Sequence, residues 1–241
     1  MEAQRQPIQR GLVVVAHPDD PEYGCAGTIA AWIAEGLEVT YVIATDGGKG
    51  TADVAMTSQA LVRTRREEQI AAARVIGVKE VVFLDYPDGY IQHTLELRKD
   101  ITRAIRQFRP DRLVTYSPYR VLTINAYINH IHPDHLAVGD ATLAAVYPTA
   151  RDRLMFPDLA EAGFEPHIVR EVYVMGTETP DCWIDIAATI ELKIQALQQH
   201  ASQIGDPAAA EQHVRRRAAA TASASNLGLE YAECFKLMRF S

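Results

Sequence analysis

Two short runs of histidine and aspartate hold the side chains of this sequence that could bind a metal or move a proton. The first run is His17-Pro18-Asp19-Asp20. Proline favours a tight turn and paired aspartates can cap a following helix, so this run alone also fits a structural role. A second run of the same kind makes a metal-binding site the stronger interpretation.

The second run contains three histidines and comes much later in the chain, as His130-Ile131-His132-Pro133-Asp134-His135. Catalysis by zinc needs three protein ligands of the histidine or carboxylate type and an open position for water. His17 and Asp20 can bind one ion from a single turn of chain, and His135 could complete the set. We therefore predict one Zn²⁺ per chain, with another divalent metal as the alternative. Bound zinc would lower the pKa of its water to about 7.

The other side chains of the two runs would act on the reacting atoms. Asp19 diverges from the neighbouring carboxylate and is placed as the general base toward the attacking water. His132 could protonate a leaving amine or stabilise an oxyanion. Asp134 is expected to orient one of the imidazoles. His130 either lines the substrate pocket, to which we assign it, or is packed in the interior.

Both runs follow stretches that predict buried strands, Leu12 to Ala16 and Arg112 to Thr115. Further strands are expected, with helices between most of them, at residues 38–44, 80–84, 171–175 and 182–185. This alternation predicts an α/β fold, a Rossmann-like doubly wound, mostly parallel sheet with helices on both faces. In the strand order 3-2-1-4-5, strands 1 and 4 are neighbours, so the two runs would meet in one crevice.

Composition limits the class of protein. The chain has 241 residues, 48% of them apolar, which suits one domain over 1–241, with a core of about 11–203 and a C-terminal extension of about 204–241. The net charge of −7 argues against nucleic acid, because phosphate binding needs clustered lysine and arginine. Three widely spaced cysteines predict reduced thiols and a cytoplasmic protein. No apolar run reaches the roughly 18 residues that a membrane span requires. A homo-oligomer is left open.

Three further segments could border the crevice. Arg63, Arg65 and Arg66 near the start of one predicted helix could bind an oxygen-rich ligand or pair with nearby glutamates. Asp88, in a turn after the third strand, could hydrogen-bond a sugar. The glycine-rich loop at 45–51 lacks the spacing of a phosphate-binding loop, so we expect a flexible loop at the mouth of the site.

The two runs and their flanking residues resemble the signatures of the LmbE-like, or PIG-L-type, N-deacetylase family. Ala16 to Thr28 is similar to the family's AHPDDxE stretch with its glycine-rich continuation, and His132 to Gly139 is similar to its HPDHxAVG stretch. One departure is Pro21, which displaces the acidic residue by one position. The resemblance extends from residue 12 to about residue 203.

This resemblance implies a Rossmann-like, zinc-dependent amide hydrolase that acts on N-acetylglucosamine conjugates and releases acetate and a free amine. At matching positions it implies the same metal ligands, general base and intermediate-stabilising histidine as those chosen above. It adds Arg65 and Asp88 as residues that hold the sugar. The partner it implies is a small N-acetylated sugar or conjugate.

Two other functions are alternatives. The first is an amidase that cleaves a larger amide conjugate, which bulky acyl substrates would distinguish from a deacetylase. The second is a Rossmann-like module that binds a nucleotide without catalysis. The second is disfavoured, because the first strand is followed by His-Pro-Asp-Asp instead of the GxGxxG of a dinucleotide site.

Overall fold

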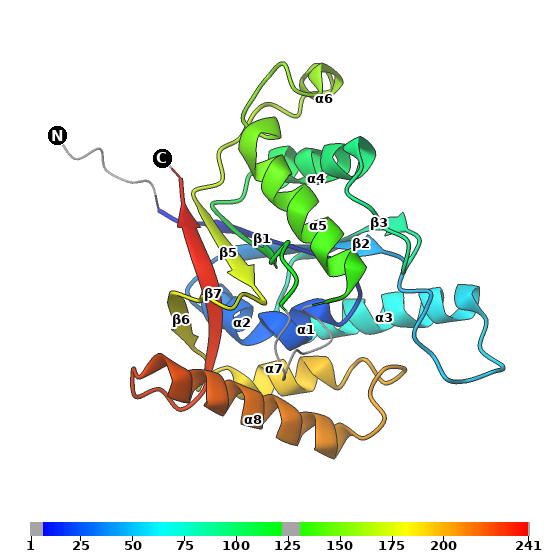
Figure 1. The fold of residues 1–241 in the computed structure, drawn as a ribbon, viewed down its shortest axis with the longest axis vertical. Coiled ribbons are helices and arrows are strands. Elements are labelled where there is room, and N and C mark those ends of the chain that lie inside the picture. The colour runs from blue at the N-terminus through cyan, green and yellow to red at the C-terminus, as the bar shows by residue number, and fades with distance from the viewer. Residues whose placement is uncertain (1–6, 122–130, 241) are drawn as a thin grey trace.

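A seven-stranded sheet runs through the computed structural model, which describes residues 7–121 and 131–240 (Figure 1). Its strands are β1 (Arg10–Val15), β2 (Glu38–Thr45), β3 (Glu80–Tyr86), β4 (Arg112–Tyr116), β5 (Glu171–Met175), β6 (Cys182–Asp185) and β7 (Ala232–Arg239). Their order is β3-β2-β1-β4-β5-β7-β6. The first five strands are parallel, and β7 is antiparallel to β5 and β6. The predicted doubly wound, mostly parallel sheet is therefore confirmed.

Helices cover both faces of this sheet, as predicted. They are α1 (Asp20–Gly24), α2 (Ala26–Ala34), α3 (Ser58–Ile76), α4 (Leu95–Phe108), α5 (Pro133–Ala144), α6 (Pro157–Glu161), α7 (Ile190–Leu197) and α8 (Pro207–Ser225). In Figure 1, α4 and α5 lie on one side of the sheet, and α2, α3, α7 and α8 lie on the other. Among the described residues, no helix combines the length and apolar character that crossing a bilayer requires.

Strand β1 is apolar throughout because it is covered on both faces. Val13 and Val15 belong to the core beneath α2 and α3, whereas Leu12 and Val14 belong to the core against α4 and α5. All four side chains are at most 1% exposed. Successive residues of a strand point to opposite faces, so burial on both faces requires a continuous apolar run.

The sequence predicts a helix over Ser58 to Ile76, and α3 forms with these bounds. The Thr57 side chain accepts a hydrogen bond from the Ala60 N–H at 3.2 Å, which caps the start of the helix. Gly77 ends it in the left-handed conformation, at φ 89°. The buried side of α3 carries two polar residues, Arg65 and Gln69, among apolar ones. Both belong to the site described below.

Two elements near the ends of the chain show what the sequence patterns could and could not predict. A helix predicted over about Cys25 to Glu35 forms as α2, with these two residues as its caps, but the one-turn helix α1 before it was not predicted. Residues 230–240 fit a strand or a helix by pattern, and they form β7. Both partners of β7 lie earlier in the chain, so local sequence could not decide its structure.

Candidate metal-binding site

The two runs lie side by side because β1 and β4 are neighbouring parallel strands. Their pairing extends from Gly11 and Arg112 to Val13 and Val114, so their carboxyl ends meet at one edge of the sheet. The first run directly follows β1, and the second leads into α5 at Pro133. Side chains that are distant in sequence therefore meet at the switch point, where α/β sheets bind ligands.

Three predicted ligands converge on one point. His17 Nδ1 lies 3.1 Å from His135 Nε2, and His135 Nε2 lies 3.2 Å from Asp20 Oδ1. The other oxygen of Asp20, Oδ2, lies 3.5 Å from His17 Nδ1. Two ligand atoms on a tetrahedral zinc ion with bonds of about 2.1 Å are roughly 3.4 Å apart. Two imidazoles and one carboxylate at these spacings fit a zinc ion.

Asp20 is held as a carboxylate by the chain around it. Its Oδ2 accepts hydrogen bonds from the Ala16 N–H at 3.1 Å and the His17 N–H at 2.8 Å, and the Tyr116 hydroxyl donates to Oδ1 at 3.1 Å. Burial opposes ionisation, but His135 and His17 outweigh it and hold the pKa of Asp20 well below its usual range. The ionised carboxylate is the form that binds a metal.

His17 is oriented through its second ring nitrogen. Its Nε2 lies 3.2 Å from Asp134 Oδ2 and 3.1 Å from Asp88 Oδ1. Burial would lower the pKa of His17, but the neighbouring carboxylates, chiefly Asp134, raise it well above its usual value. A proton on Nε2 leaves Nδ1 directed at His135 and Asp20, and carboxylates commonly orient metal-binding histidines in this way.

Two further groups of side chains have the spacing of a metal site. Possible ligand atoms of His17, His132 and His135 lie within 4.8 Å of one another, and so do those of His17, Asp88 and Asp134. The second group includes the carboxylates that bind His17 Nε2, which suits them better to orienting that ring. The first group makes His132 the competitor of Asp20 for the third ligand position.

Asp19 lies beside the ligands with its carboxylate turned toward Arg65. Its Oδ2 is 3.3 Å from Arg65 Nη2, and its backbone adopts a left-handed conformation, φ 87° and ψ −24°. Burial raises the pKa of Asp19 to about 6, although Arg65 opposes this increase. A carboxylate with this pKa is largely ionised at neutral pH and is still basic enough to take a proton from water.

The pH dependence of turnover follows from this shift. We expect kcat/KM to rise with pH and then to level off, because only ionised Asp19 can accept a proton. The midpoint of this rise should lie at or below the metal-free pKa of about 6, because a bound cation stabilises the carboxylate. Initial rates measured across pH at saturating metal test the expectation. A rate that fell as the pH rose toward neutrality would contradict it.

His132 and Asp134 begin helix α5. His132 Nδ1 accepts a hydrogen bond from the Asp134 N–H at 3.2 Å, so the proton of the neutral ring lies on Nε2. Burial, together with His17 and His135, lowers the pKa of His132. Asp134 is fully buried, and its Oδ2 accepts from the Gly89 N–H at 2.7 Å while contacting His17. The ring that Asp134 orients is therefore that of His17.

The two residues predicted to hold sugar are packed against the glycine-rich loop. Arg65 is 5% exposed and donates to the carbonyl oxygens of Pro18 at 2.7 Å and Gly47 at 3.1 Å. Asp88 is 6% exposed and accepts from the Lys49 N–H at 3.0 Å. Both side chains thus fix this loop at the edge of the site.

Tyr116 is a site residue that the sequence reasoning missed. Its ring stacks on that of His135, with centroids 4.2 Å apart and planes 5° apart. The close approach depends on Gly139 of α5, where a Cβ atom would lie 2.4 Å from the Tyr116 carbonyl oxygen. Tyr116 ends β4, so the rule that located the two runs at strand ends could have found it too.

Three fully buried polar residues behind the site were also missed: Glu22 of α1, Gln69 of α3 and His200 after α7. Gln69 follows Arg65 by one helical turn, so a polar stripe on the buried side of α3 was its signal. The predicted pocket residue His130 lies outside the described residues, and its role stays a prediction.

A sequence profile described as PIG-L, GlcNAc-PI de-N-acetylase, matches residues 12–146, a stretch that includes both runs. The chain belongs to the PIG-L family. A diacetylchitobiose deacetylase of Thermococcus kodakarensis is 31% identical over 196 residues, which cover 81% of this chain and 70% of that protein. A probable N-acetyl-alpha-D-glucosaminyl L-malate deacetylase 2 of Bacillus anthracis is 28% identical over 197 residues, covering 80% of each chain.

Solved structures share the fold over almost the whole chain. N,N'-diacetylchitobiose deacetylase from Pyrococcus horikoshii, in complex with its inhibitor MPG, has a TM-score of 0.87 and 29% identity. This match covers 96% of this PIG-L chain and 84% of that one. A 4-carboxy-2-hydroxymuconate hydratase from Pseudomonas putida KT2440 has a TM-score of 0.77, with 97% and 98% of the two chains covered, but only 20% identity. The second likeness concerns the fold alone, so the activity must be inferred from the site.

Proposed function

We propose that this protein hydrolyses the N-acetyl amide of an amino sugar or amino-sugar conjugate and releases acetate and a free amine. The observation that carries the proposal is the convergence of His17, Asp20 and His135 at 3.1–3.5 Å, with Asp19 alongside. The names of the relatives support the substrate class, because they are deacetylases of diacetylchitobiose and of N-acetyl-glucosaminyl malate.

The metal in this proposal is Zn²⁺, held by His17 Nδ1, His135 Nε2 and a carboxylate oxygen of Asp20. When bound, zinc would supply a water of lowered pKa and polarise the amide carbonyl. The spacing of the three ligand atoms and the ionised state of Asp20 support this set. Asp134 and Asp88 keep the His17 ring in the orientation that the set requires.

Asp19 takes the proton from the attacking water and then returns it to the leaving nitrogen. Its pKa of about 6 supports both steps, since the carboxylate is ionised at neutral pH and its acid form is strong enough to protonate an amine. His132 keeps a proton on Nε2 in its neutral form and donates it as a hydrogen bond to the developing oxyanion. The lowered pKa of His132 favours this role over that of a general acid.

Substrate binding is assigned to Arg65, Asp88 and His130. Arg65 and Asp88 both contact the loop at residues 47–49, and we propose that they shape the sugar site through this loop as well as by direct contact. For His130 the proposal rests on its place in the sequence, two residues before His132.

The proposal is tested with purified protein, metal analysis and a panel of amides. We expect close to one zinc ion per chain. We also expect acetate release from N,N'-diacetylchitobiose or another N-acetylglucosamine derivative to exceed release of a bulky acyl group from the matching amide by at least about tenfold. Faster hydrolysis of the bulky amides would favour the amidase alternative. Zinc-loaded protein that hydrolysed none of these amides would contradict the proposed activity.

A further inference from the structure

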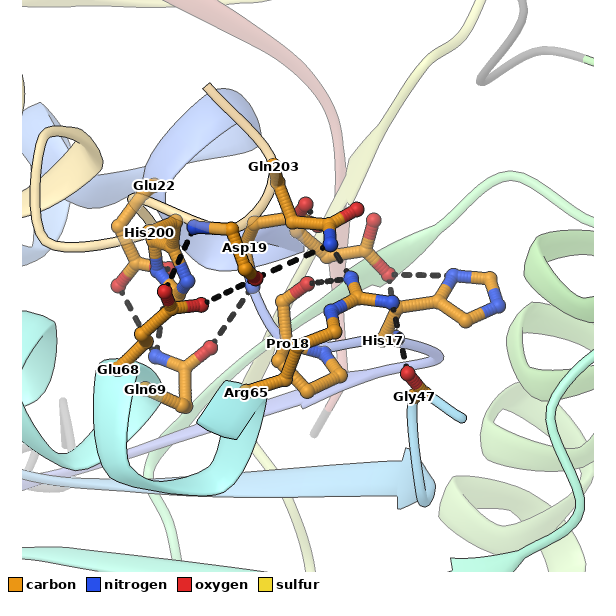
Figure 2. Close-up of polar contacts among 12 residues, drawn as sticks. His17, Pro18, Asp19, Glu22, Gly47, Arg65, Glu68, Gln69, His200 and Gln203 are labelled. Atoms are coloured by element: carbon orange, nitrogen blue, oxygen red, sulfur yellow. Dashed lines mark hydrogen bonds and ion pairs between the residues drawn. The ribbon is translucent and has the colours of Figure 1, made fainter. Parts of the chain in front are cut away.

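A chain of buried hydrogen bonds leads from Asp19 to Gln69, Glu22 and His200, on the side of Asp19 away from His17 (Figure 2). The Asp19 N–H donates to Gln69 Oε1 at 2.9 Å. Gln69 Nε2 lies 3.2 Å from each carboxylate oxygen of Glu22, and His200 Nε2 lies 3.1 Å from Glu22 Oε2. Glu22, Gln69 and His200 are all 0% exposed. The mechanism proposed above uses none of these three residues.

The backbone of Asp19 needs such support. A non-glycine residue at φ 87° costs about 1–2 kcal/mol relative to the right-handed region. This conformation lets Asp20 fold back onto the Ala16 and His17 N–H groups while the Asp19 carboxylate turns the other way, toward Arg65. If Asp19 relaxed, both carboxylates would lose their present directions.

Gln69 can serve as that support because its amide has only one favourable orientation. Its NH₂ group faces the two oxygens of Glu22, so its carbonyl oxygen faces the Asp19 N–H. Rotating the amide by half a turn would set its oxygen against a carboxylate and its NH₂ against an N–H. The Glu22 carboxylate is itself positioned by the His200 side chain. The backbone carbonyl oxygen of His200 accepts hydrogen bonds from the Gln203 and Ile204 N–H groups, which fixes the chain at this point.

Burial of three polar groups is costly and would not be needed for packing alone. Apolar residues in place of Glu22, Gln69 and His200 would fill the same space without burying a carboxylate, an amide and an imidazole. The contact of Gln69 with Asp19 is the link between this buried chain and the reacting groups.

We propose that Gln69 is a positioning residue, oriented by Glu22 and His200, which holds the Asp19 backbone in its left-handed conformation and so aims the Asp19 carboxylate at the attacking water. The catalytic part of this inference rests on the proposed function, in which Asp19 is the base. The structural part concerns the Asp19 N–H and can be measured without substrate or metal.

The test compares Gln69→Met, which keeps the length of the side chain but not its hydrogen bonds, with Ser202→Ala. Ser202 donates hydrogen bonds to Glu68 at 2.7 Å and so joins α3 to the turn after α7. Its hydrogen-bond partners among the described residues do not include Gln69, so it is the matched control. With N,N'-diacetylchitobiose as substrate, we expect Gln69→Met to lower kcat by about 10–100-fold, with KM changed by less than about threefold and zinc content unchanged. Ser202→Ala should keep the kcat of the original protein.

Amide hydrogen exchange, monitored by NMR, tests the structural part of the inference without a measurement of enzyme activity. The Asp19 N–H should exchange at least about tenfold faster in Gln69→Met than in the original protein or in Ser202→Ala. An unchanged exchange rate of the Asp19 N–H would overturn the inference. A fall in kcat that came with an equally large change in KM and a matching loss of zinc would overturn it too. If the original protein released no acetate, the proposed function would fail while the exchange data still decided the role of Gln69. If Gln69→Met did not fold, His200→Phe would decide instead, with faster Asp19 exchange expected and an unchanged rate overturning the inference.

Discussion

Replacing Asp19 with asparagine is expected to lower kcat by about 10³-fold while the protein keeps its metal. Asparagine has the same shape, tolerates the left-handed conformation at φ 87° and can still accept a hydrogen bond from Arg65. It lacks the charge that takes a proton from water. Acetate release at saturating substrate, with metal analysis of the same sample, measures both expectations.

Asp140→Asn is a matched control for this variant. Asp140 lies on α5, its side chain is 60% exposed, and it pairs with His93 away from the metal ligands. Asp140→Asn removes one negative charge, as Asp19→Asn does, so it controls for the change in net charge, and its kcat should stay within about twofold of the original value. An Asp19→Asn variant as active as Asp140→Asn would exclude Asp19 as the base.

The Asp19→Asn substitution should also stabilise the metal-free protein at neutral pH. Asp19 has a folded-state pKa of about 6 against an ordinary value of 3.8, so the folded state favours the protonated form. Stability from this group is present below the ordinary pKa and is lost as pH rises through about 6. Ionisation then costs at most about 3 kcal/mol, a cost that asparagine lacks. The Tm advantage of the variant should therefore grow between about pH 4 and pH 7.

The sequence was most informative about the elements that bring the two runs together. The apolar run before His17 and the one at 112–115 were long enough to identify two buried strands, and the doubly wound order made them neighbours. Roles for His17, Asp20 and His135 could then be inferred from residue type and spacing. These three side chains converge because the first five strands follow the order β3-β2-β1-β4-β5, which is usual for a doubly wound sheet.

Features that depend on one tertiary contact could not be inferred in this way. Whether Asp134 orients His17 or His132 depends on the turn at Gly89, whose N–H holds the Asp134 carboxylate. Gln69 and His200 meet Glu22 across three separate elements, and although the polar stripe of α3 marks Gln69, no local pattern indicates which residues Gln69 contacts. The conformation of β7 could not be predicted for the same reason, because both strands that pair with it lie elsewhere in the chain.

Substituting the two histidines at the start of α5, one at a time, should separate metal binding from chemistry. His135→Gln is expected to lose zinc and activity together, because it removes a ligand atom that lies 3.1 Å from His17 Nδ1 and 3.2 Å from Asp20 Oδ1. The loss of affinity should exceed the roughly 10–100-fold that removal of an outer partner costs.

His132→Gln is the matched variant, since His132 precedes His135 by one helical turn and its ring centroid lies 5.0 Å from that of His135. It should keep zinc and lower kcat by roughly 10²-fold, because it removes only the hydrogen bond to the oxyanion. Metal analysis after dialysis and kcat at saturating zinc measure the two effects separately.

Thermal unfolding with and without a chelator gives an independent measure of the ligand set. A metal present at 100 times its Kd stabilises the folded state by about 2.7 kcal/mol, so a chelator should lower the Tm of the original protein and of His132→Gln. The Tm of His135→Gln should not respond, because that variant has little metal to lose. If His132→Gln lost zinc and Asp20→Asn kept it, the ligand set would be His17, His132 and His135, the competing cluster whose ligand atoms also lie within 4.8 Å of one another.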